Sequence, residues 1–385
     1  MKFDINHLYI LFGFVAGIAT IVIFTLLWVR KILQKHISVW YKIRDANGIE
    51  SLESVNIEGV EYWLHIRGSN RDNPILLFLH GGPGASNIGW YDAIQRPWEN
   101  YFTVVQWDQR QAGKSYKFKK HLDETISHDQ YVKDAEKMVA YLRKRFNQEK
   151  IFLMATSYGT YISMHVIKKH PDWFYAYVAI GQVVNVLEDT RTEYNLLLDF
   201  AQCHNDNELA SKLEAIKPYP DPDNTVTSFF NNIGMLQEEA SRIGKCYPAT
   251  LTESIALVAV DKWISPHYTL LDNFKRLFAT QLSSDHPFAD NFLKFNLPKE
   301  VGDTFELPIF FFSGVNDFHI PYANSDRWFN KISAPHKEHI VFNGSAHSAY
   351  LSEPGEFLIA LVTKVLPFAK MTEPNASQLA KTLDN

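Results

Sequence analysis

Short apolar runs alternate with longer segments in which apolar residues recur every three or four positions. The runs lie at Glu61–Arg67, Ile75–Leu79, Val104–Gln106, Ile151–Met154, Tyr177–Ile180, Ile309–Phe312 and His339–Val341. Several are rich in Ile, Val, Leu and Phe throughout, which is typical of central parallel strands covered on both faces. Between two of them, Asp129–Phe146 carries one apolar stripe at helical spacing. The pattern predicts an α/β domain: a mostly parallel central sheet flanked by helices.

This alternation stops between about residues 183 and 301. The apolar residues there follow helical periods, and the stretch 217–224 is rich in proline and aspartate, which end helices. We expect a helical cap at 183–301, inserted between a first part of the core at 55–182 and a second part at 302–370. The remaining residues, 371–385, form a polar tail that we expect to fray.

The N-terminal segment has a different pattern, because Leu8–Val29 contains no charged residue. It is long enough to cross a bilayer as a helix, and no small-residue cleavage site follows it, which favours an uncleaved anchor over a signal peptide. We therefore expect a membrane anchor at 1–30 and a basic juxtamembrane linker at 31–54. The positive-inside bias favours a cytoplasmic domain, since five basic residues follow the span: Arg30, Lys31, Lys35, Lys42 and Arg44.

Composition and charge narrow the class of protein. Of the 385 residues, 46% are hydrophobic and 21% charged, as in a globular protein, and the net charge of −5 argues against a nucleic-acid partner. Cys203 and Cys246 are the two cysteines, and neither lies in a C-x-x-C pair or near histidines at metal-ligand spacing. We expect free thiols, with a disulfide between them left open, and no metal or cofactor.

The first chemical motif lies in 151–165, which reads as a strand, a sharp turn and the start of a helix. Ala155, Ser157 and Gly159 form a small-x-Ser-x-Gly pattern. A nucleophile elbow needs small residues at these two flanking positions, because the strand and the helix approach closely there. The pattern predicts Ser157 as a nucleophile, although a Ser/Thr pair that merely caps a helix fits it equally well.

A second motif favours the catalytic interpretation. An apolar strand runs directly into His80-Gly81-Gly82-Pro83-Gly84. In esterase-like enzymes such a loop supplies one donor of the oxyanion hole, and the residue after the nucleophile supplies the other. The donors here would be the N–H groups of Gly82 and Tyr158. The alternative is a glycine-rich turn without a catalytic part.

The remaining partners of a serine nucleophile are expected in the order acid, then histidine. Asp317 follows the strand that begins near Leu307, and His347 follows the strand at His339–Val341. Asp317 would orient the imidazole of His347, which would accept the proton of Ser157. His319 is the weaker candidate for the base, because it shares the loop of Asp317.

Taken together, HGGPG (80–84), WDQRQAGKS (107–115), SYG (157–159) and the two later loops resemble the prolyl aminopeptidase (proline iminopeptidase) branch of the α/β hydrolases. The resemblance covers about 56–182 and 307–368. It implies removal of an N-terminal residue, commonly proline, from short peptides without metal or cofactor. It also implies that Trp107–Arg110 shapes the floor of the pocket, with Asp108–Arg110 in a structural rather than a catalytic role.

Three features depart from that family. Gln111 and Ala155 stand where the family has glycine, and the cap shows no matching motif for the glutamates that hold the substrate's free amine. Glu188 and Glu193 are the nearest candidates for that role, with a solvated helix face as the alternative.

The sequence therefore favours a membrane-anchored serine hydrolase that forms an acyl-enzyme, and we expect an aminopeptidase that releases N-terminal proline or another small residue from short peptides. Two alternatives stay open: a carboxylesterase or lipase-like enzyme with the same triad, and a catalytically silent binding module. Epoxide hydrolases and dehalogenases of this fold are disfavoured, because they need a carboxylate in place of Ser157.

Overall fold

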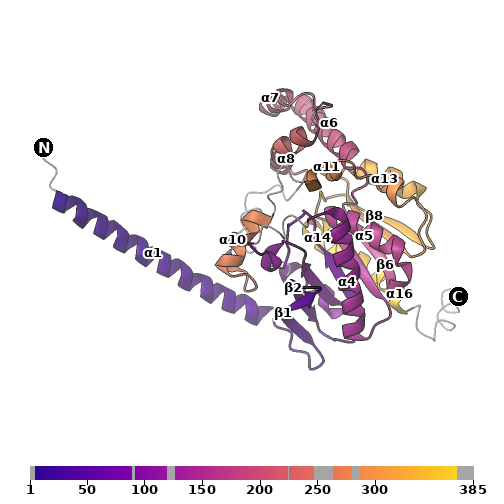
Figure 1. Ribbon diagram of the computed structural model, residues 1–385, viewed down its shortest axis with the longest axis horizontal. Coiled ribbons are helices and arrows are strands. Elements are labelled where there is room, and N and C mark those ends of the chain that lie inside the picture. Colours follow the sequence, from indigo (N-terminus) through magenta and orange to yellow (C-terminus); the bar gives the residue numbers. More distant parts are fainter. Residues whose placement is uncertain are drawn as a thin grey trace.

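The computed structural model describes residues 5–88, 92–118, 126–223, 225–246, 263–279 and 287–370. The expected polar tail at 371–385 lies outside these residues, as do three parts of the expected cap, 224, 247–262 and 280–286. Figure 1 shows a sheet flanked by helices, a helical layer at one end of the sheet and a long N-terminal helix leading away from the domain.

The sheet has eight strands in the order β1-β2-β4-β3-β5-β6-β7-β8. β1 and β2 pair antiparallel, as do β2 and β4, and the other neighbours run parallel. This confirms the mostly parallel sheet, and each expected strand lies within an observed one. The strands are β1 (Ile49–Ile57), β2 (Val60–Gly68), β3 (Ile75–Leu79), β4 (Thr103–Asp108), β5 (Ile151–Thr156), β6 (Phe174–Ile180), β7 (Ile309–Gly314) and β8 (Lys337–Phe342).

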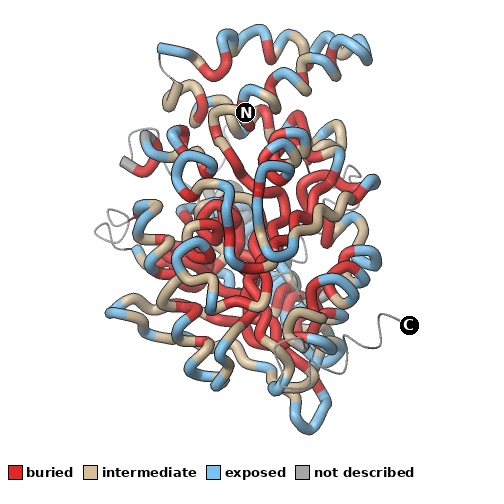
Figure 2. Tube along the Cα trace, turned by 90° about the vertical axis from the view of Figure 1, so that its right-hand side faces the viewer, coloured by how far each residue is buried: buried red, intermediate tan, exposed pale blue. Residues whose placement is uncertain are grey.

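Both faces of the sheet are covered by apolar side chains, because successive residues of a strand point to opposite faces. Leu77 and Leu79 of β3 pack on the side of α4 (His128–Phe146) and α5 (Tyr158–Lys169). Leu76 and Phe78 pack on the other side, where α14 (Ala349–Ser352) and α15 (Pro354–Ala360) lie. The buried positions in Figure 2 accordingly run through the centre of the domain.

The insertion between β6 and β7 is helical, as expected. Its helices are α6 (Val186–His204), α7 (Asn207–Ala215), α8 (Thr225–Arg242), α10 (Leu270–Ala279), α11 (Pro287–Phe292) and α12 (Leu297–Glu300). α6, α7 and α8 share a small core of their own that includes Leu197, Leu209 and Leu236. They project beyond one end of the sheet in Figure 1.

The short elements complete the domain. They are α2 (Asp92–Gln95), η1 (Trp98–Asn100), η2 (Gly113–Ser115), η3 (Pro171–Trp173), α13 (Tyr322–Lys331), η5 (Leu361–Val365) and α16 (Pro367–Lys370). Cys203 is exposed and Cys246 is buried, and both are free thiols, as expected.

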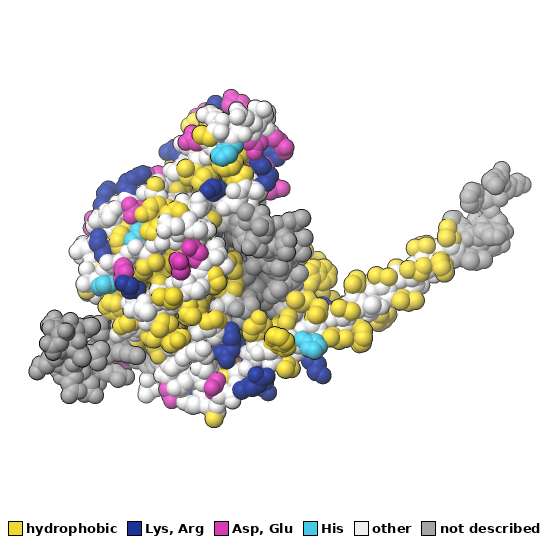
Figure 3. All heavy atoms as spheres, turned by 180° about the vertical axis from the view of Figure 1, so that it is seen from behind, with side chains coloured by type: hydrophobic (Ala, Val, Ile, Leu, Met, Phe, Trp, Pro, Cys, Tyr) yellow, Lys and Arg dark blue, Asp and Glu magenta, His cyan; other side chains and the backbone are white. Residues whose placement is uncertain are grey.

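The N-terminal helix α1 spans Ile5–Trp40. Its segment Leu11–Trp40 is long and apolar enough to cross a membrane, by length and composition. Figure 3 shows hydrophobic side chains along its length. Near its end, the side chains of Arg30 and Gln34 are buried against the domain.

The expected linker at 31–54 needs correction. α1 continues to Trp40, and β1 begins at Ile49 and pairs with β2 along its whole length. A two-residue turn at Glu58 and Gly59, with φ of 51° and 83°, joins these strands. β1 escaped prediction because it is an edge strand whose residues are half-buried or exposed, so its apolar pattern is weak.

Candidate active site

Ser157 lies in the sharp turn between β5 and α5. Its φ of 52° belongs to the left-handed region, which is uncommon for a residue other than glycine. The Ser157 N–H donates to Ile180 O at 3.0 Å, which ties the turn to the end of β6. At Gly159, an added Cβ would lie 2.6 Å from Leu79 O, so the turn needs glycine there. The hydroxyl is thereby held beside the N-terminus of α5, where negative charge is favoured.

The glycine-rich loop after β3 lies directly against this serine. A Cβ added at Gly81 would lie 2.9 Å from the Ser157 Cβ, and Gly82 has a φ of 112°. Gly82, Ser157 and Tyr158 line the same cavity. The two expected oxyanion donors are therefore neighbours of the serine.

His80 connects the loop to the Trp107–Arg110 segment. Its Nε2 accepts from Gln109 N–H at 3.2 Å, and its carbonyl accepts from the Gln109 side chain at 2.8 Å. Burial lowers the pKa of His80 to about 4, so the imidazole is neutral and can accept at Nε2. These hydrogen bonds between Gln109 and His80 hold the glycine-rich loop in place.

The segment does not form the floor of the cavity that the resemblance implied. None of the described residues Trp107–Gln111 is among its lining. Instead, Arg110 forms a buried ion pair with Asp134 of α4 at 2.7 Å. Gln111 has a φ of 52° and bonds through its side-chain amide to both backbone groups of Lys117. These residues hold the chain in place and do not contact the cavity.

Asp317 and His347 meet past the ends of β7 and β8. His347 Nδ1 lies 2.7 Å from Asp317 Oδ2, and both side chains are almost fully buried. Asp317 Oδ1 accepts from Ile320 N–H at 2.9 Å, which fixes the carboxylate. Gly181 follows Ile180, whose carbonyl accepts from the Ser157 N–H, and it packs against the Asp317–His347 pair. A Cβ added at Gly181 would lie 3.1 Å from His347 Cε1. Serine, aspartate and histidine thus gather at neighbouring strand ends.

The segment that follows α8 holds both loops. Phe318 N–H donates to Lys245 O at 2.8 Å, and His347 N–H donates to Cys246 O at 3.0 Å. The cap therefore positions the aspartate and histidine loops as well as covering them.

A cavity of about 390 Å³ opens from Ser157 beneath the cap. Most of its wall is apolar, with contributions from Val183, Val186, Phe229, Phe230, Ile233, Phe288, Phe292 and Ile320. Besides Ser157 and Tyr158, five polar side chains of the described residues lie in the same wall: Asp189, Thr190, Glu193, Gln237 and His319.

Glu193 and His319 form a buried pair. His319 Nδ1 lies 3.2 Å from Glu193 Oε1, and the amide nitrogen of Gln237 lies 3.0 Å from His319 Nε2. His319 Nδ1–H donates to Glu193, and Nε2 lies against the Gln237 amide. Burial alone would lower the pKa of His319, but the carboxylate of Glu193 outweighs it and the pKa is raised. Because both ring nitrogens are engaged, the geometry favours His347 over His319 as the base.

The two glutamates expected in amine binding differ in position. Glu193 is almost fully buried and lines the cavity. Glu188 forms an ion pair with Arg327 on the surface and is not among the described lining residues. The expectation for Glu188 therefore needs correction: it lies on the outer face of α6.

Asp189 lies in the cavity wall and was missed in the sequence. Burial raises its pKa to about 7, against hydrogen bonds from Asn324 and the backbone of Val184. A spacing of four residues puts it on the same face of α6 as Glu193. The same spacing of four leads on to the buried Leu197, and this periodicity could have identified Asp189 as a residue on the inward face of α6.

No group of three or more His, Cys, Asp and Glu side chains in the described part of the chain is arranged to hold a metal ion.

Comparisons with known proteins agree with this architecture. Residues 74–208 match a family model described as the alpha/beta hydrolase fold. The chain is 30% identical over 316 residues to a probable aminopeptidase, YbaC, of Bacillus subtilis strain 168, covering 82% of this chain and 96% of that protein.

Two solved structures share the fold. A proline iminopeptidase-related protein of Thermus thermophilus has a TM-score of 0.57 at 18% identity, covering 83% of this chain and 99% of that one. A membrane phospholipase A, described as a bacterial virulence factor, has a TM-score of 0.54 at 15% identity, covering 94% and 97%. The predicted fold class is confirmed.

The close approach at Gly159 gives a testable prediction. Gly159→Ala should lower the free energy of unfolding by about 1–3 kcal/mol, because the new methyl overlaps the Leu79 carbonyl. Gly234→Ala, in α8, is the matched control: its Cβ would meet nothing within 4 Å, and alanine should stabilise the helix by about 1 kcal/mol. Denaturant unfolding of the full chain in detergent measures both. Equal shifts of the same sign would contradict the tight packing at Gly159.

Proposed function

The chain belongs to the α/β-hydrolase family, and from that premise we propose that it is a serine hydrolase in which Ser157, Asp317 and His347 form the catalytic triad. The observation that carries the proposal is the Asp317–His347 hydrogen bond of 2.7 Å at the strand ends beside the strained Ser157 turn. A metal or cofactor is not needed for this chemistry.

In the first half-reaction, His347 Nε2 accepts the proton of the Ser157 hydroxyl as the oxygen attacks the substrate carbonyl. Asp317 holds Nδ1–H of the same ring, which keeps Nε2 directed at the serine and stabilises the imidazolium. His347 then gives its proton to the leaving group, and the acyl-enzyme remains. Attack by water, again with His347 as base, releases the acid and restores Ser157.

The oxyanion of each tetrahedral intermediate is bound by the N–H groups of Gly82 and Tyr158. Two features support this role: both residues line the cavity beside Ser157, and Tyr158 is the first residue of α5. Donors fixed by the backbone need little reorganisation when the negative charge develops.

We propose that the substrate is a short peptide with a free N-terminus, from which the enzyme releases proline or another small residue. Glu193 would bind the substrate's ammonium group, because its buried carboxylate lies in the cavity wall. Burial raises the pKa of Glu193, with His319 opposing that shift, so a bound ammonium group would stabilise the charged carboxylate. Asp189 would add negative charge nearby. The name of the Bacillus subtilis relative, a probable aminopeptidase, is consistent with this substrate class.

One observation favours a second candidate, a carboxylic ester. The aromatic side chains of Phe229, Phe230, Phe288 and Phe292 give the cavity an apolar wall that could hold an acyl chain. The same triad would cleave the ester.

We also propose that α1 anchors the protein in a membrane as a single-pass helix, with the catalytic domain in the cytoplasm. The apolar side chains of Leu11–Val29 are exposed, and basic residues follow the span on the domain side.

The hydrolase proposal is tested with the full chain in detergent or nanodiscs. Proline and alanine arylamides should be turned over, and Ser157→Ala should abolish turnover. Asp317→Asn should lower kcat by about 10⁴-fold, because the imidazole loses its orienting acceptor. Turnover of short- or long-chain esters without any arylamide turnover would replace the peptidase by the esterase. Absence of all turnover from the folded chain would favour a silent binding module.

The amine site gives a second prediction. Glu193→Gln should raise KM for arylamides with a free amine by about tenfold or more, because it removes a charged hydrogen-bond partner. Glu188→Gln is the matched control and should leave KM unchanged, since Glu188 lies on the surface. Ester substrates without an amine should not distinguish the two variants. A similar effect of both substitutions on amine substrates would contradict the assignment.

A pH dependence follows from the same groups. As pH rises from about 6 to about 8, Asp189, whose pKa burial raises to about 7, gains a negative charge. His319, whose pKa the Glu193 carboxylate raises, loses its proton late in the same rise. Both changes make the cavity more negative, so KM for amine substrates should fall over this range. It should rise again above about pH 8, where the substrate's own ammonium loses its proton. Steady-state kinetics over this pH range, with an amine substrate and with an ester that has no amine, measures the effect. Identical pH profiles of KM for the two substrates would contradict it.

A further inference from the structure

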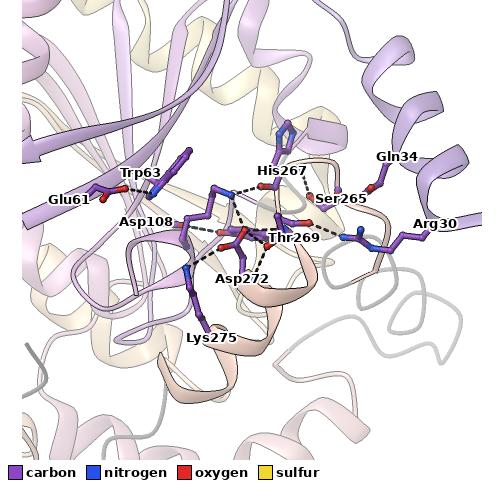
Figure 4. A network of polar contacts seen from close by, with 12 residues as sticks. Arg30, Gln34, Glu61, Trp63, Asp108, Ser265, His267, Thr269, Asp272 and Lys275 are labelled. Carbon is purple, nitrogen blue, oxygen red and sulfur yellow. Dashed lines mark hydrogen bonds and ion pairs between the residues drawn. The ribbon is translucent and has the colours of Figure 1, made fainter. Parts of the chain in front are cut away.

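Helix α10 is oriented the opposite way from an ordinary surface helix, because its polar side faces the protein. Asp272 is buried and forms an ion pair with Lys114 at 2.9 Å. The guanidinium of Arg276 lies over the ring of Tyr268, 5.1 Å from its centroid, and donates to Ser86 O at 3.4 Å. Figure 4 shows Asp272 within a network of polar contacts that includes Thr269 and Lys275. The polar residues of α10 therefore attach it to the domain.

The other side of α10 presents large apolar side chains to the outside. These residues are between 37% and 58% exposed: Leu270, Leu271, Phe274, Leu277 and Phe278. Phe118, from the loop after η2, extends the surface, with its ring 6.2 Å from that of Phe274 and 5.5 Å from that of Phe278. We call these six side chains the α10 face. A cluster of this size is unusual on a surface that contacts only water.

The α10 face lies next to the point where α1 leaves the domain. Arg30 donates to Tyr268 O at 2.8 Å, and Gln34 donates to Ser265 O at 2.7 Å. Both acceptors directly precede α10 in the chain, and Figure 4 shows α1 and this segment side by side. In Figure 1, α10 lies at the edge of the domain toward the N-terminal part of α1.

The length of the span places this junction at the membrane surface. At 1.5 Å per residue, the uncharged segment from Leu8 to Val29 covers roughly 30 Å, about the thickness of the hydrocarbon core. Arg30 then marks the level where the bilayer ends, and its bond to Tyr268 puts the start of α10 at the same level. Lys31 and Lys35 follow at the depth of the headgroups.

We propose that the α10 face is a second membrane contact that inserts into the interfacial layer of the leaflet from which α1 emerges. It builds on the proposed anchor, but it does not depend on the hydrolase activity. Amphipathic helices bind at this depth by burying their apolar side among the acyl chains near the headgroups. A lipid surface fits the face because α1 already brings the bilayer to its edge.

Insertion of the α10 face would fix the orientation of the catalytic domain relative to the membrane. A single helix anchor leaves a domain free to tilt, whereas two contacts define a plane. Arg276 of α10 donates to the carbonyl of Ser86. The residue before Ser86 in the chain, Ala85, lines the cavity at Ser157. Insertion of the α10 face would hold this side of the active site close to the bilayer.

Site-directed spin labelling of the full chain in nanodiscs containing neutral and anionic lipids tests this proposal. Nitroxides are introduced at Phe274→Cys and Leu277→Cys in a Cys203→Ser background, since the native Cys246 is buried. Ile359→Cys, an equally exposed apolar position on α15, is the matched control, and Phe14→Cys reports on α1. Collision with oxygen relative to a water-soluble nickel chelate should be several-fold higher at 274 and 277 than at 359.

The outcomes separate the three proposals. If position 14 is in lipid while 274 and 277 behave like 359, the α10 contact is wrong and the anchor stands. If position 14 also behaves like 359, both membrane proposals are wrong. Spin–spin broadening at 277 from a neighbouring molecule would show that a second copy covers the face, which also overturns the proposal. None of these readouts requires hydrolysis, so failure of the enzyme activity would be recognised separately.

Discussion

The close approach of backbone segments around Ser157 is the constraint on which the rest of the structure depends. Three strand ends meet there, and at Gly81, Gly159 and Gly181 an added Cβ would come within 3.1 Å of a neighbouring atom. The left-handed backbone of Ser157 persists because these neighbours surround it. The strained turn thereby presents the hydroxyl of Ser157 at the end of the sheet.

The apolar core and the cap hold that arrangement. Parallel strands buried on both faces bring their carboxyl ends to one edge of the sheet, where Ser157, Asp317 and His347 follow β5, β7 and β8. The cap then adds what the sheet lacks: carbonyls that bind the aspartate and histidine loops, an apolar cavity wall and the acidic face of α6. We infer that the sheet supplies the chemistry and the cap the choice of substrate.

Much of this could be predicted from the sequence, because fully apolar strands and an elbow motif are local signals. β1 was missed because an edge strand has little apolar pattern to detect. Glu188 and Glu193 could not be separated without the orientation of α6, and Asp189 was overlooked beside them. The interpretation of Trp107–Arg110 as a pocket floor failed because contacts with His80 and Asp134 are long-range.

Helix α10 shows a different limit. Periodicity identifies an apolar side of a helix but not which way it faces, and the usual assumption that this side is buried is wrong here. Its direction depends on Lys114, far away in the sequence, which binds Asp272. The outward orientation of the apolar side can be recognised only once the residues that bind the polar side of α10 are known.

We propose that Ser157 is a nucleophile activated by His347. The most direct test of this proposal is labelling of the folded full chain with a fluorophosphonate, followed by mass mapping of the modified peptide. We expect one modification, at Ser157, which His347→Ala strongly slows and which Ser163→Ala, at a buried serine of α5, leaves unchanged. Absence of labelling in the folded chain, or labelling at another residue, would contradict it.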